Sequence, residues 1–210
     1  MSDPTDPTDP IGPVGRGPAE PSGDFPELNV DPGLDVDPAL AAAVLEIEEH
    51  AAEAGWNRQA RLFSLVDTRE LVAREPALAS LMGLDASDAE GSFTPVEQDL
   101  PADLPLEQVL ESVGWPDDVV GCAVVVERLV LPPSADGQVP DDIDAAQAFA
   151  ADHPLRQEVR MVAGVTRAGA TYCAMRLRAY DNPQSVVTGA DLVPALLAML
   201  RGTLDEEGEA

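Results

Sequence analysis

The sequence contains no lysine. Its twelve basic residues are all arginines, set against 39 acidic residues and a formal net charge of −27. Without lysine the chain cannot form a lysine Schiff base or hold pyridoxal phosphate in the usual way. The acidic excess repels phosphate backbones and anionic lipids, so we expect neither nucleic acid nor a membrane as a partner.

Aromatic residues, cysteines and long apolar runs are also scarce. Aromatic residues make up 4% of the chain, which leaves little material for a pocket that stacks a nucleobase or a flavin. The stretch "LVPALLAML" at 192–200 is too short to span a bilayer, and no secretory signal precedes it. Two cysteines in such a chain predict free thiols in a reducing compartment, so we expect a cytoplasmic protein.

Established catalytic and metal-binding motifs are missing. The sequence has neither the paired cysteines nor the paired histidines of a zinc site, and no phosphate-binding, dinucleotide-binding or hydrolase motif. The acidic loop "DASDAEG" at 85–91 fails as a calcium loop, because Ala89 and Glu90 occupy a ligand position and the required glycine. We therefore assign no catalytic residue, no metal site and no cofactor, although 39 acidic residues leave carboxylate catalysis possible.

The two ends of the chain differ from its middle. Residues 1–36 open with "DPTDPTDP" and remain rich in proline, glycine and acidic residues, with too few apolar residues to offset the entropy of ordering. We expect a disordered acidic leader at 1–36, a disordered acidic tail at 205–210, and one α+β domain over 37–204.

Helical periodicity and capping residues predict five helical regions. The first is the clearest, because Asp37 can cap it, Pro38 suits its first position and Gly55 suits its end. Leu40, Val44, Ile47 and Ala51 recur on one face of this helix. The other helical regions are expected from Thr68 to Gly83 with a break at Pro76, at 105–113, from Asp141 or Asp142 to His153, and at 189–202.

Four segments have the composition and alternation of strands, and they lie at 58–66, 121–131, 157–166 and 171–180. The stretch "SFTPV" at 92–96 could add a short edge strand, where proline is tolerated. We expect an antiparallel sheet of about four strands with helices packed mainly on one of its faces.

The last two strands form a hairpin whose register can be chosen from burial. A two-residue loop would place Arg160 among apolar residues. A three-residue loop at 167–169 pairs Met161 with Met175 and Ala163 with Cys173, and puts Gly169 where a left-handed residue is needed. We therefore predict the three-residue loop.

Two thiols need an assignment. Cys173 falls on the buried face of the hairpin, and Cys122 begins a strand that has the pattern of a buried one. Because free cysteine commonly packs as a small hydrophobic residue, we expect both in the core. The alternative is a catalytic dyad of Cys122 with His50 or His153, but no motif brings these residues together.

The hairpin register sets Arg160 opposite Arg176, and Glu158 opposite Arg178, on the outer face. Like charges directly across a strand pair are unfavourable unless an anionic group lies between them. Carboxylates of the domain's own helices could supply that group. Alternatively Arg160, Arg176 and Arg178 form a partly exposed binding site for an anionic ligand or an acidic partner segment.

The stretches "GWPDDVVGCAVVVERLVLPP" (114–133) and "VRMVAGVTRAGATYCAMRLRAYD" (159–181) resemble a family of uncharacterised actinobacterial proteins. The resemblance covers most of 38–204 and implies a cytosolic α+β domain without known catalytic residues. A looser resemblance to small acidic secretion-chaperone domains implies a protein partner or a homodimer. We expect a non-catalytic binding or adaptor module that acts through protein–protein contacts. The alternative is a hydrolase or ligand-processing enzyme that uses carboxylates.

Overall fold

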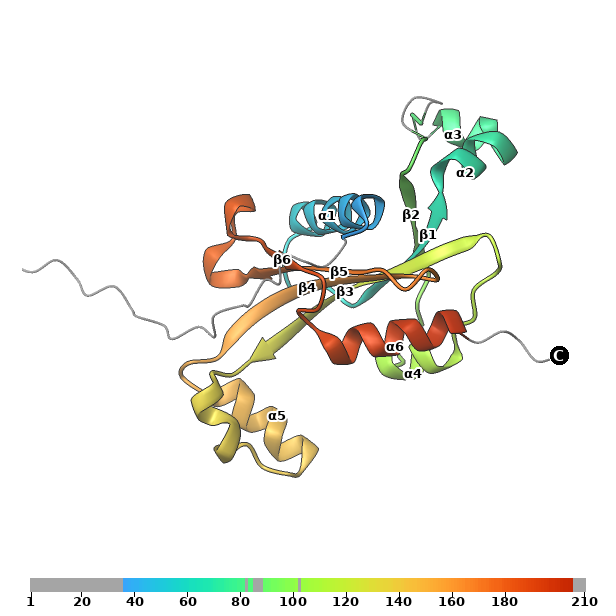
Figure 1. Ribbon diagram of the computed structural model, residues 1–210. Helices are drawn as coiled ribbons and strands as arrows, with labels where there is room; N and C mark the ends of the chain where they lie inside the picture. Colours follow the sequence, from blue (N-terminus) through green and yellow to red (C-terminus); the bar gives the residue numbers. More distant parts are fainter. Residues whose placement is uncertain (1–35, 82, 85–88, 102, 206–210) are drawn as a thin grey trace, which may run out of the picture.

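The computed structural model describes residues 36–81, 83–84, 89–101 and 103–205. The predictions for the leader at 1–36 and the tail at 205–210 therefore lie almost wholly outside the described residues. What is described is an antiparallel sheet with helices around it (Figure 1).

The sheet has the strand order β2-β1-β3-β4-β5-β6, and every pair in it is antiparallel. The α+β class is confirmed, but the sheet has six strands rather than about four. One additional strand, β2, overlaps the stretch at 92–96 that could add an edge strand, and the other, β6, has only three residues, too few for a clear alternation. The bounds are β1 Arg61–Asp67, β2 Phe93–Gln98, β3 Val119–Val130, β4 Gln157–Thr166, β5 Thr171–Leu177 and β6 Val187–Gly189.

Helices cover both faces of this sheet, so the expectation that they lie mainly on one face is wrong. Figure 1 shows α1 (Pro38–Glu53) on one side, and α4 (Leu106–Ser112) with α6 (Pro194–Asp205) on the other. The reason is that the central strands are apolar on both sides, a pattern that is more common in the buried strands of parallel sheets. The α1 face carries Phe63, Leu65, Ala123, Val125, Val162 and Ala174, and the α6 face carries Leu62, Cys122, Val124, Val126, Ala163, Val165 and Cys173.

The first helix forms as its sequence predicts. The carboxylate of Asp37 accepts hydrogen bonds from the backbone N–H groups of Ala39 and Leu40, at 2.9 and 3.1 Å. Pro38 takes the first helical position, where its missing N–H removes no intrahelical bond. Gly55 follows the helix with φ of 80°, a left-handed conformation that ends it.

Three helices lie at the periphery. Figure 1 shows α2 (Thr68–Arg74) and α3 (Pro76–Leu81) near one end of the β1–β2 pair, and α5 (Ile143–Asp152) beyond the far ends of β3 and β4. Short 3₁₀ turns occur at Pro133–Gln138, Arg178–Tyr180 and Pro183–Ser185. Within the described part of the chain, no helix is long and apolar enough to cross a membrane.

The hairpin register is confirmed. Met161 pairs with Met175 and Ala163 with Cys173, across a three-residue loop. Gly169 closes the loop with φ of 90°, and its N–H donates to the carbonyl of Thr166 at 2.9 Å. The register fixes which β4 and β5 side chains meet on the α1 face.

Candidate functional site

The three predicted binding arginines do lie together, at the end of the α1 face where α1 stops. Arg160 stands opposite Arg176 in the register, as expected. However, Arg160 is 1% exposed and Arg176 is 5% exposed, so the expected partial exposure is wrong for both. Only Arg178, with a side chain 39% exposed, reaches solvent. We call these three residues, with Trp56, the arginine cluster.

A carboxylate of α1 neutralises Arg176. Nε and Nη2 of Arg176 donate to the two carboxylate oxygens of Glu48 at 2.7 and 2.6 Å, and Nη1 of Arg176 lies 3.4 Å from Asp181. Glu48 is itself only 3% exposed. The hydrogen bond to Glu48 is the main reason that the pKa of Arg176 is raised above its usual value. The positive charge of Arg176 is therefore paired within the domain.

Arg160 is held by a loop and by its neighbour on β3. Its Nη2 donates to the carbonyl of Gly55 at 2.6 Å and lies 3.3 Å from Glu127, while its guanidinium stacks on the Trp56 ring at 4.3 Å. The indole N–H of Trp56 in turn donates to Asp181 at 2.8 Å. Nη1 of Arg160 is a buried side-chain nitrogen without a hydrogen-bond partner among the described residues. Stacking and ion pairing thus replace solvent around this guanidinium.

Arg178 closes the cluster at the surface. It forms an ion pair with Glu158, donates to Asn57 at 3.0 Å and lies 5.6 Å from the centre of the Trp56 ring. The Glu158–Arg178 contact agrees with the predicted pairing. Whether Arg178 binds a partner stays a prediction.

Glu48, the partner of Arg176, was missed by the sequence analysis, although a signal for it existed. It follows Val44 by four residues and precedes Ala51 by three, so helical spacing places it on the buried face of α1. A carboxylate in an apolar helical stripe needs a cationic partner, and the arginine pair of the hairpin supplies one. Trp56 and Glu127 carried no comparable signal.

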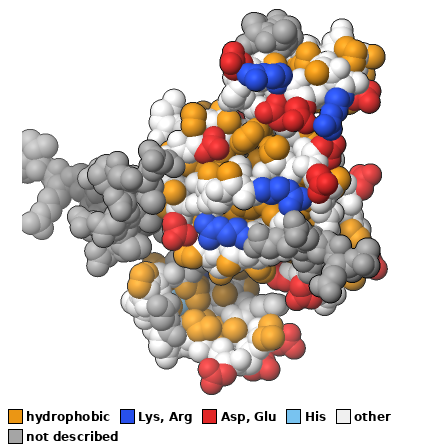
Figure 2. All heavy atoms as spheres, turned by 45° about the vertical axis from the view of Figure 1, so that its right-hand side comes forward, with side chains coloured by type: hydrophobic (Ala, Val, Ile, Leu, Met, Phe, Trp, Pro, Cys, Tyr) orange, Lys and Arg blue, Asp and Glu red, His pale blue; other side chains and the backbone are white. Residues whose placement is uncertain are grey.

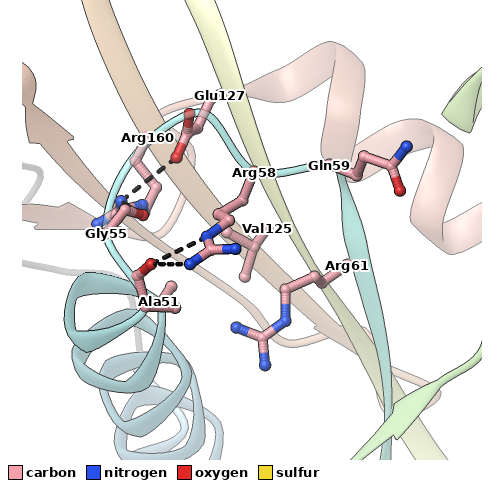
Figure 3. A pocket seen from close by; sticks show the side chains of 9 residues that line it. Ala51, Gly55, Arg58, Gln59, Arg61, Val125, Glu127 and Arg160 are labelled. Carbon is pink, nitrogen blue, oxygen red and sulfur yellow. Dashed lines mark hydrogen bonds and ion pairs between the residues drawn. The ribbon is translucent and has the colours of Figure 1, made fainter.

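A cavity next to the cluster brings arginines and a carboxylate together. Figure 3 shows Arg58, Arg61, Arg160 and Glu127 among its lining residues. Its volume is about 10 Å³, roughly the space of one water molecule. Arg58 is already bonded to the carbonyl of Ala54, at 2.9 and 2.7 Å. The cavity is too small for an organic substrate.

The α6 face ends in a larger, open groove. Its volume is about 290 Å³, and the ion pair of Arg128 with Glu107, at 3.0 Å, stands at its border. Figure 2 shows hydrophobic side chains gathered low on the face drawn, at the heights at which Figure 1 shows α6 and, lower still, α5. The apolar lining of the groove consists of Val126, Met161, Val193, Pro194, Ala195, Leu196 and Met199.

Both cysteines lie in the core, as predicted, and are reduced. Burial raises the pKa of the Cys122 thiol to about 11, against a hydrogen bond with Thr203 that lowers it. His50 belongs to α1, on the opposite face of the sheet from Cys122, so these two residues form no dyad. Within the described ranges no three histidine, cysteine or acidic side chains are grouped to hold a metal ion.

A family model described as PPA1309-like protein matches residues 40–205, from α1 to the end of α6. The chain belongs to the PPA1309-like family. No curated protein and no solved structure matches it. The expected membership of an uncharacterised family is thereby confirmed, and actinobacterial origin stays a prediction. Both the arginine cluster and the groove lie inside the PPA1309-like region.

Proposed function

We propose that this PPA1309-like chain is a non-catalytic binding module that holds a segment of another protein in the groove of the α6 face. The open groove of about 290 Å³ is the observation that supports the proposal. Binding sites for segments of other proteins are characteristically concave and apolar, with few polar groups at the border. The arginine cluster, by contrast, already has carboxylate partners within the domain.

The lining of the groove suits side chains of varied shape. Met161 and Met199 come from β4 and α6 and stand at the groove together with Leu196. Methionine side chains are flexible and polarisable, so they repack around different apolar groups. We therefore expect the groove to accept an amphipathic segment through two or three apolar side chains.

The charge of the chain selects the partner. A net charge of −27 attracts basic segments and repels acidic ones at long range. The chain's own acidic leader and a second copy of the domain are disfavoured in the groove for the same reason. We therefore propose a basic amphipathic segment of another protein as the occupant of the groove.

The test measures binding of three synthetic peptides of equal length to the full chain by fluorescence anisotropy. One is amphipathic with arginines on its polar face, one has glutamates there, and one is a scrambled version of the first. We expect the first to bind at least about tenfold more tightly than the others, a difference of ~1.4 kcal/mol. Equal binding of the basic peptide and its scrambled version would overturn the proposal.

A matched pair of variants separates the groove from simple charge attraction. Met199→Glu places a carboxylate in the groove, whereas Leu45→Glu places one on α1, at a position that is similarly exposed (37% and 42%). If the groove holds the peptide, Met199→Glu weakens binding at least about tenfold and Leu45→Glu leaves it unchanged. If attraction to net charge alone holds it, both variants bind the basic peptide slightly better, and the groove has no role.

A further inference from the structure

The helix α5 packs against little of its own domain. It spans Ile143–Asp152 and contains no buried residue, and Figure 1 shows it beyond the ends of β3 and β4, away from α1 and α6. A helix of ten residues has little stability of its own in water, and in proteins such helices are stabilised by burying one face. A partner outside the domain would supply that burial.

The two ends of α5 carry large exposed hydrophobic side chains. Ile143 at its start is 73% exposed and Leu155 just after its end is 63% exposed. Among the described residues, only Leu81 is a more exposed large hydrophobic side chain. The helix that begins at Ile143 has ten residues and is about 15 Å long, and Leu155 follows three residues after its end.

Each of these hydrophobic residues is followed by a charge, and the two charges have opposite signs. Asp144 follows Ile143, and Arg156 follows Leu155. Neither side chain has an ion-pair partner among the described residues. The guanidinium of Arg156 has only a contact of 3.5 Å with the carbonyl of His153.

We propose that α5 packs antiparallel against α5 of a second copy of this chain, across a two-fold axis. Ile143 then lies across from Leu155 of the second copy, and Asp144 across from Arg156, with both contacts repeated by the symmetry. In a two-fold interface the same surface of each copy must contain both residues of every contact. The surface of α5 and its end contains both residues of each of these two contacts.

The net charge of the chain opposes this contact, and the segment adds Asp141, Asp142 and Asp152 to Asp144. Two chains of charge −27 repel each other, but salt screens such repulsion beyond about 8 Å at physiological ionic strength. Because α5 lies at one end of the molecule, the antiparallel arrangement keeps the two sheets apart (Figure 1). This contact does not involve the groove residues Met161 and Met199, so it does not depend on the proposed function.

The first experiment is light scattering of the full chain across a concentration series, together with disulfide trapping. We expect a species of twice the 22.1 kDa mass of one chain. A mixture of an Ile143→Cys chain with a Leu155→Cys chain should form a disulfide-linked dimer, because the two positions lie within reach across an antiparallel pair. Each chain alone should not form one. The native cysteines are buried and do not compete.

The second experiment exchanges the charges. Asp144→Arg alone and Arg156→Asp alone should each raise the dissociation constant about tenfold, because each creates two like-charge contacts, and the double variant should restore it. Leu45→Asp, at an exposed position of α1, is the control and should change nothing. A chain that stays monomeric at roughly 100 µM overturns the proposal. So does a dimer that both exchanges leave unaffected, or one trapped by Ile143→Cys alone.

Discussion

The two faces of the sheet end differently. On the α1 face the polar end is closed: the guanidinium groups of Arg160 and Arg176 are buried, and each has a carboxylate partner. On the α6 face the ion pair of Arg128 and Glu107 is half exposed, and next to it an apolar groove stays open. In this acidic chain arginines cross-link the fold, so clustered positive charge does not mark a binding surface. The uncovered apolar surface is the better marker.

The largest expected effect comes from breaking the closed face. Glu48→Ala leaves Arg176 buried beside the weaker Asp181 contact, and removing one partner of a buried ion pair typically costs about 3–5 kcal/mol. We expect that loss in the free energy of unfolding, measured by urea denaturation. Glu49→Ala, one residue further along the same helix and exposed, is the matched control and should cost less than about 0.5 kcal/mol.

A double variant tests whether the cost arises from the unpaired charge. Glu48→Ala combined with Arg176→Met removes both charges and should recover most of the lost stability, because no buried guanidinium remains without its partner. A loss below about 1 kcal/mol in the single variant would mean that solvent reaches the cluster. The contrast between the two faces would then fail.

The next effect compares closed and open parts of the α6 face. Burial raises the pKa of Cys122 to about 11, from an ordinary value of 9.0. Only the thiolate reacts with alkylating reagents, so this shift alone lowers the reactive fraction near pH 8 about 100-fold, or ~2.7 kcal/mol. A cysteine placed in the groove by Met199→Cys should label at least that much faster than Cys122 in the native chain.

The two rates should converge when the chain is unfolded in urea, which serves as the internal control. Cys173 should behave as Cys122 does, because burial raises its pKa too. Rapid native labelling of Cys122 would show that the core of this face opens, and would restore interest in a catalytic thiol.

Most of the fold could be predicted from local signals. Asp37 with Gly55 bounds α1, and burial alone selected the three-residue hairpin loop. Signals were weaker where neighbours in space decide. The predicted strand at 58–66 is displaced to β1 Arg61–Asp67, and Trp56, in the segment before it, lies against Arg160. The three-residue β6 forms only because β5 offers it a free edge.

The candidate site was harder to predict for a physical reason. The sequence brought Arg160 and Arg176 together correctly, since the pairing follows from the strand register. Their exposure depended on Glu48, which lies 128 residues from Arg176 along the chain. A register predicts neighbours within a sheet, but the helix that covers the sheet decides whether they reach solvent. The groove likewise depends on where α6 crosses β3 and β4.

The smallest expected effect concerns an ion pair at the border of the α1 face. Arg61 donates to both oxygens of Glu97 at 2.7 Å, and this hydrogen bonding lowers the pKa of Glu97 below its usual 4.5. A carboxyl group whose pKa is lowered in the folded state stabilises the fold at pH values above its unfolded-state pKa. This stabilisation is lost as the pH falls through the folded-state pKa. Because Glu97 is 48% exposed, solvent screening limits the contribution to less than about 1 kcal/mol.

Glu97→Gln should therefore reduce the free energy of unfolding slightly at pH 7, and the difference from the unaltered chain should shrink as the pH is lowered from 7 to 3. The two pH values lie on either side of the isoelectric point of about 4.1, where solubility is lowest. Urea denaturation measures both, and Glu49→Gln, at an exposed position of α1, controls for removal of one negative charge. If the loss of stability in Glu97→Gln persists unchanged at pH 3, Glu97 acts through packing. If the loss is as large as that in Glu48→Ala, exposed and buried ion pairs of this face contribute equally to stability.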